Sequence, residues 1–361
     1  MIHINTPIKQ FLWGKLISDY DEPNNKNVIW TLPIIFFIFS LFLIPIGIHR
    51  IHIIPLLKTF ILSVLMSGSI YYLWNRFNSF GVAVCLFFAP FYFVGFYLHS
   101  LYPILCLYLI STFILSLYYL RTPNTRFTGQ KLWALFIVGV FFVPVLFQRY
   151  EFAYTSPYMA LNIHRDTLYH SSLAAMIKNW GVSSIGVHGL LRSGYHVGSH
   201  AIFAAISSIA DLSILECYAY FYPFVIIPLF YTCVICLIEE IEPSKNSQTY
   251  ITRTMIIAII LTGIRSPIYQ ISLFLPNFDG SESYTFGLLF LFSLISILFS
   301  LETKYNFSRH LGICSFLLLF YITATTKISI PFVFLGLLFS WLIAGRGINP
   351  LVRVFIFISS C

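Results

Sequence analysis

Apolar runs long enough to cross a lipid bilayer follow one another along most of this chain. A transmembrane helix needs about 20 mainly apolar residues. Such runs lie at about 28 to 48, 53 to 74, 80 to 98, 101 to 120, 131 to 149, 217 to 238, 251 to 272, 284 to 300, 310 to 326 and 330 to 345. Only 9% of the residues are charged, against roughly 25% in soluble domains. The sequence therefore predicts an all-α, polytopic membrane protein with about 10 to 11 transmembrane helices.

The two ends of the chain differ from this pattern. A last apolar run begins near Pro350 and stops at Cys361, too short to cross the membrane. We therefore expect the chain to be incomplete at its C-terminus. The polar first 27 residues lack the short apolar region and small-residue cleavage site of a secretory signal peptide. The first span is thus expected to direct insertion.

The largest polar interruption is the segment from 150 to 216, which holds five of the ten histidines. Titratable groups are costly inside a membrane protein and by default mark a functional site. We expect this segment to be a large loop that carries the active site.

Lysine and arginine predict the side of the membrane on which this loop lies, because they accumulate in cytoplasmic loops. With the N-terminus inside and 198 to 213 not crossing, six later basic residues fall inside and only Arg265 and Lys327 fall outside. If 198 to 213 crosses the membrane, the six residues fall outside and Arg265 and Lys327 fall inside, which the charge bias disfavours. The loop is therefore expected on the external face of a bacterial inner or plasma membrane. The segment 273 to 283 lies on the same side. Its Asp279 and Glu282 either assist the acceptor or a metal or, in the preferred interpretation, belong to a solvated loop.

Two stretches of the loop have the periodicity of amphipathic juxtamembrane helices. In 166 to 180, apolar residues recur at helical spacing and Gly181 supplies a C-terminal stop. In 198 to 213, one face carries Ile202, Ile206 and Ile209, and the other carries His200, Ser207 and Asp211. Both are expected to lie along the membrane surface with a polar face toward water.

The order of these elements resembles that of integral-membrane glycosyltransferases of the GT-C superfamily, especially the protein mannosyltransferase and aminoarabinose-transferase branch. The resemblance rests on Asp166 with Tyr169, the helix LAAMIKNWG, the turn GVHGLLRSGYH and the helix SHAIFAAISSIADL. Arg165-Asp166 stands where the family often has two adjacent acids, and Tyr195 to His200 replaces a usual Lys-Pro-Pro. The resemblance implies a transmembrane core from 131 to 361 with an external catalytic loop from 150 to 216. Residues 1 to 130 would then be an N-terminal four-span extension.

The resemblance also implies a reaction, the transfer of a sugar from a polyprenyl-phosphate-linked donor to a glycan, lipid or protein acceptor. Asp166 is the expected base, although it also suits the N-cap of the helix that starts there. His170 lies four residues later on the same helical side and is the second expected catalytic residue. The expected substrate-binding residues are Arg165, Arg192, Tyr195, His196, His200, Arg265, Asp279, Glu282 and Lys327.

A divalent metal stays an open alternative. Asp166 with His170, and His196 with His200, have the i, i+4 spacing that places two ligands on one helical face. No complete metal motif accompanies them, so no residue is assigned as a ligand and no cofactor is assigned. The Cys233-x-x-Cys236 pair lies in an apolar run and is interpreted as packing.

Two other functions were weighed against glycosyl transfer. A polysaccharide polymerase or ligase also uses a large external loop, although usually later in the chain. A transporter is disfavoured because no inverted repeat is visible. The net charge of +8 follows from the topological bias of lysine and arginine, so the expected partners are the lipid bilayer and the substrates, with no nucleic acid.

Overall fold

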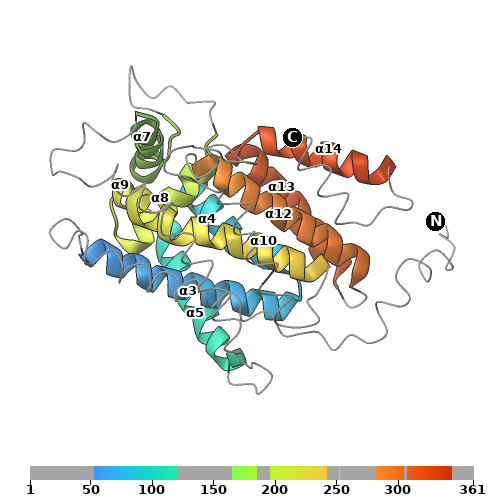
Figure 1. Cartoon of the computed structure of the whole chain (residues 1–361). Coiled ribbons are helices and arrows are strands. Elements are labelled where there is room, and N and C mark those ends of the chain that lie inside the picture. The colour runs from blue at the N-terminus through green and yellow to red at the C-terminus, as the bar shows by residue number, and fades with distance from the viewer. Residues whose placement is uncertain are drawn as a thin grey trace, which may run out of the picture.

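The computed structural model describes residues 53–120, 165–184, 196–241, 252, 282–304 and 307–343. All regular elements within these ranges are helices (Figure 1). They are α3 (Ile53–Phe77), α4 (Phe80–Tyr97), η2 (His99–Leu101), α5 (Tyr102–Leu120), α7 (Arg165–Trp180), α8 (Gly198–Ala210), α9 (Ile214–Glu216), η4 (Cys217–Ile226), α10 (Ile227–Ile241), α12 (Glu282–Thr303), α13 (Arg309–Thr326) and α14 (Ser329–Ile343).

Six of the described helical stretches are long and apolar enough to cross a membrane. They are Ile53–Phe77, Phe80–Tyr97, Tyr102–Tyr119, Ile214–Ile238, Glu282–Thr303 and Arg309–Thr326. Each coincides with an apolar run of the sequence to within a few residues. The predicted spans at 28 to 48 and 131 to 149 lie outside the described residues, as does the one at 251 to 272 apart from residue 252. The chain is thus a helical, multi-pass membrane protein.

Helix α4 forms the centre of the bundle and packs against α3, α8, α12 and α13. Two glycines bring it very close to its neighbours. A Cβ atom on Gly81 would lie 2.0 Å from the carbonyl oxygen of Ser293 in α12, and one on Gly95 would lie 2.0 Å from that of Ala201 in α8. Small residues allow helix backbones in membrane proteins to approach in this way.

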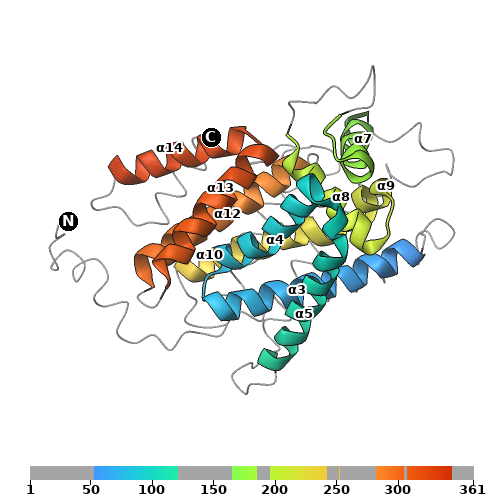
Figure 2. The same cartoon turned by 180° about the vertical axis from the view of Figure 1, so that it is seen from behind.

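The helix bundle is seen from two opposite sides in Figures 1 and 2, and different polar contacts lie at its two ends. At one end, the Glu240 carboxylate accepts a hydrogen bond from the Phe80 backbone N–H at 3.2 Å and pairs with Nζ of Lys304 at 3.1 Å. At the other end, Nζ of Lys58 lies 2.8 Å from Oδ2 of Asp211. The second end also holds α7, α8 and the first turn of α12 (Figure 1). We call it the loop end.

Helix α7 packs on α8 at the loop end. Nζ of Lys178 in α7 donates to Oγ of Ser207 at 2.7 Å and to the carbonyl oxygen of Leu212 at 3.1 Å. Helix α7 ends at Trp180, and Gly181 follows with a φ of 67°. This left-handed conformation carries no penalty for glycine.

Helix α8 differs from the expected surface helix. All residues from Gly198 to Ser207 are buried, on the polar face as well as the apolar face. The polar side chains of His200 and Ser207 are turned toward other parts of the protein, where α7 supplies partners for both. A buried polar group is stable when such partners are present. Amphipathic spacing alone does not distinguish a water-exposed face from one covered by a second helix.

Candidate functional site

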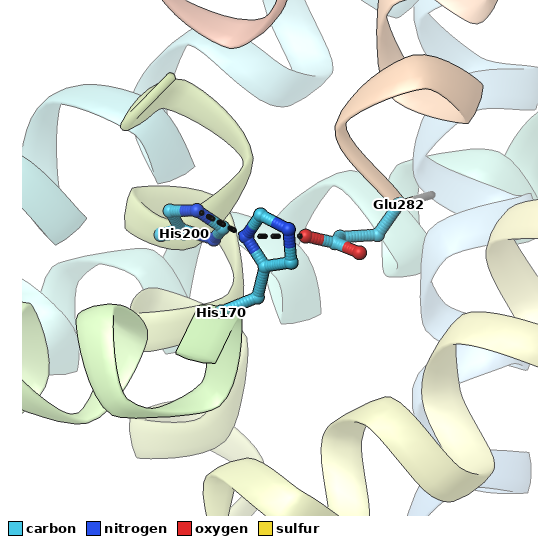
Figure 3. A group of neighbouring side chains, drawn as sticks. All are labelled: His170, His200 and Glu282. Carbon is cyan, nitrogen blue, oxygen red and sulfur yellow. Dashed lines mark hydrogen bonds and ion pairs between the residues drawn. The ribbon is translucent and has the colours of Figure 1, made fainter. Parts of the chain in front are cut away.

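Three buried polar side chains converge at the loop end (Figure 3). Nδ1 of His170 lies 3.2 Å from Nε2 of His200 and 3.2 Å from Oε1 of Glu282. The three residues are 2%, 0% and 4% exposed, respectively. One donor or acceptor atom from each lies within 4.8 Å of the others. We call these three residues the His–His–Glu cluster.

Each member of the cluster comes from a different helix. His170 lies in the second turn of α7, His200 in the first turn of α8, and Glu282 is the first residue of α12. The preferred prediction for Glu282, a solvated loop, was wrong, because the side chain is buried at the start of α12. Its position at a helix N-terminus stabilises the carboxylate through the helix dipole.

A single proton cannot satisfy the contacts inside the cluster. Nδ1 of His170 has two neighbours, and a proton on this nitrogen points at only one of them. If it points at Glu282, Nδ1 has no lone pair left for His200, and a lone pair on Nε2 of His200 faces it without receiving a proton. If Nε2 of His200 instead donates to Nδ1, the lone pair of Nδ1 is left beside the carboxylate, which is an acceptor only when ionised. The cluster therefore has the character of a cation-binding or proton-transfer site.

The other ring nitrogen of His200 has a partner of its own. Nδ1 lies 3.2 Å from the hydroxyl of Tyr218, and the Tyr218 ring stacks on Phe203 with centroids 4.4 Å apart. Tyr218 belongs to η4, a ten-residue π-helix. Such segments are rare and often occur at functional sites. The contact with Tyr218 fixes the orientation of the His200 ring.

Two further groups set the electrostatics around the cluster. Half-buried His196 lies just before α8, and half-buried Lys327 follows the end of α13. Burial, together with the neighbouring Lys327 charge and His170, lowers the pKa of His196 from its ordinary value. Burial, with His170 and His196 nearby, holds the pKa of His200 well below its usual range. Both imidazoles are consequently neutral at pH 7, as metal ligation and general base catalysis require.

The structure brings together several of the residues that the sequence singled out. His170 directly contacts both His200 and Glu282, and the pKa of His196 responds to Lys327. The backbone places Arg165 and Asp166 in the first turn of α7. Arg192, Tyr195, Arg265 and Asp279 lie outside the described residues.

The pairing within the cluster differs from the pairs suggested by sequence spacing. His170 contacts His200 of a second helix, 30 residues away. Tyr218 was missed, because it lies in the aromatic run CYAYFY and nothing in its spacing marks it. Only the packing of α8 against η4 identifies it.

No known protein family, curated protein or solved structure matches the chain.

Proposed function

We propose that the protein is an integral-membrane glycosyltransferase of the GT-C type. It would move a sugar from a polyprenyl-phosphate-linked donor to a glycan, lipid or protein acceptor at the external membrane face. The observation that carries this proposal is the buried His–His–Glu cluster at the end of a bundle of spanning helices.

The position of the cluster suits a substrate that is carried by a lipid. Helices α12 and α13 are candidate spans, and the first residue of α12 belongs to the cluster while Lys327 directly follows α13. Groups at such helix ends lie where the lipid headgroup region begins. A donor with a polyprenyl tail in the bilayer would present its phosphate at this depth.

The residue types also suit the reaction. Lysine neutralises phosphate oxygens as a point charge, which would favour departure of the polyprenyl phosphate. Positions 166 and 170 lie one helical turn apart on the same face of α7. Asp166 is therefore proposed as the base that takes the proton from the acceptor nucleophile, with His170 beside it.

The test uses cells that natively make the protein. Deletion of the gene is expected to cause a lipid-linked glycan to accumulate, measured by mass spectrometry of extracted lipids. The wild-type gene is expected to restore the profile. Asp166→Asn is expected to lower transfer by at least about a hundredfold, as loss of a general base does, with normal accumulation in the membrane.

Asp211→Asn is the matched control. Asp211 also lies at the loop end, but its side chain is 96% exposed and pairs with Lys58. This variant is expected to restore the profile fully. Full restoration by Asp166→Asn would exclude the base role, and unchanged glycans with a transport defect in the deleted cells would contradict glycosyl transfer itself.

A further inference from the structure

We propose that His170, His200 and Glu282 bind one divalent transition-metal ion of the zinc type. Three protein ligands would leave one coordination position for water or for an oxygen of a substrate. This inference concerns binding and does not depend on the proposed glycosyl transfer.

The distances within the cluster suit a tetrahedral ion. Zinc lies about 2.0 to 2.1 Å from histidine nitrogen and about 2.0 to 2.2 Å from carboxylate oxygen, so ligand atoms at tetrahedral corners are about 3.3 Å apart. Nδ1 of His170 is 3.2 Å from both of its neighbours in the cluster. All three ligand atoms lie within 4.8 Å of one another. Small side-chain rotations therefore suffice to surround an ion.

A cation also resolves the arrangement of lone pairs described above. Neutral imidazole nitrogens and an ionised carboxylate each offer a lone pair to a metal. All three can then point at the same centre, whereas one proton serves only one contact at a time.

The ligand set selects the class of metal. Two imidazole nitrogens and one carboxylate suit zinc and its neighbours among the transition metals. Calcium and magnesium prefer oxygen ligands throughout. Sites with three protein ligands and one open position are typical of catalytic zinc, whereas structural sites are closed by four protein ligands.

The surroundings of His200 support the same assignment. A metal-bound histidine usually donates its other ring N–H to an oxygen, which fixes the tautomer. With Nε2 as the ligand atom, Nδ1–H of His200 is free to donate to the Tyr218 hydroxyl at 3.2 Å.

The position of the site between three helices has a consequence for stability. An ion held by α7, α8 and α12 joins both loop helices to a candidate span. A ligand that binds only the folded state raises the unfolding temperature. Zinc is therefore expected to stabilise the purified chain.

The test is zinc binding by the full chain in detergent. Protein washed with a chelator is titrated with Zn²⁺ in competition with a chromogenic chelator, and bound metal is counted by elemental analysis. The wild type is expected to take up one ion per chain. His200→Gln and Glu282→Gln are each expected to weaken binding by more than about a hundredfold, because removal of even an outer partner costs about 10- to 100-fold.

His310→Gln is the matched control for adventitious zinc. His310 is exposed at the start of α13 and lies outside the cluster. It is expected to bind zinc as the wild type does. A folded wild type that binds no more zinc than His200→Gln would overturn the proposal.

Thermal unfolding provides a second measurement that does not need the ligand variants, and it applies even if those variants fold poorly. Zinc is expected to raise the unfolding temperature of the chelator-washed wild type and of His310→Gln. Absence of a shift in the wild type at saturating zinc would also contradict the site. Loss of glycan transfer in a chain that still binds zinc would leave the metal site standing and would count against the proposed reaction alone.

Discussion

The hydroxyl of Tyr218 contacts Nδ1 of His200, whereas Nε2 of the same ring contacts His170. If Nε2 of His200 binds a metal, the Tyr218 hydroxyl holds the ring in the tautomer that ligation requires. The two residues are 18 positions apart and come from different elements. A contact of this kind should influence metal affinity without supplying a ligand.

Tyr218→Phe is accordingly expected to weaken zinc binding by about 10- to 100-fold, the usual effect of losing an outer partner. The ring and its stacking on Phe203 are kept, so the unfolding temperature without zinc should change little. The measurement is the same competition titration with Zn²⁺. Tyr222→Phe is the control, because it also removes a buried hydroxyl, one that contacts Thr285 at 2.8 Å. Equal affinities for both variants would show that Tyr218 does not orient His200.

The helices show which parts of the fold follow from the sequence. The ends of α4 and α13 were predicted to within one residue, because an uninterrupted apolar run sets the length of a span. Which helix ends lie next to one another depends on contacts between side chains that are far apart in the sequence. The periodicity of a single segment does not predict these contacts. The sequence indicated a functional role for each member of the cluster, His170, His200 and Glu282, because titratable side chains are rare in this chain. Their meeting at one point depends on how α7 and α8 pack over α12.

The crossing of α4 and α8 should be intolerant of a larger residue at position 95. In Gly95→Ala, the added Cβ would meet the backbone oxygen of Ala201, which cannot move without shifting α8. We expect a loss of about 1 to 3 kcal/mol, as for other overpacked sites, measured by thermal unfolding in detergent.

Gly287→Ala is the comparison for this crossing. Its Cβ would meet side-chain atoms of Ile330 and Lys327, at 2.9 and 3.1 Å. Cγ1 of Ile330 can move by rotation of its side chain, and Cβ of Lys327 needs to give by only a few tenths of an ångström, so the loss should be smaller. An unfolding temperature for Gly95→Ala equal to that of the wild type would show that α8 is not fixed against α4.

Across the whole molecule, a buried carboxylate lies at each end of the helix bundle, in a different setting. Glu282 at the loop end lies 3.2 Å from His170 in the His–His–Glu cluster. The side chain of Glu240 at the opposite end is 7% exposed, and its carboxylate contacts Lys304, the Phe80 backbone and Ser296. Its partners are donors from neighbouring helices, which is the pattern of a structural link. We therefore expect the chemistry of the protein to be confined to the loop end.

The most direct test of this central claim compares Glu282→Gln with Glu240→Gln in cells that lack the native gene. Both changes keep the shape of the side chain and remove one buried negative charge. The measurement is the lipid-linked glycan profile, corrected for the amount of each variant in the membrane. We predict that Glu282→Gln fails to restore the profile and that Glu240→Gln restores it in proportion to its abundance. Full restoration by Glu282→Gln would contradict the account.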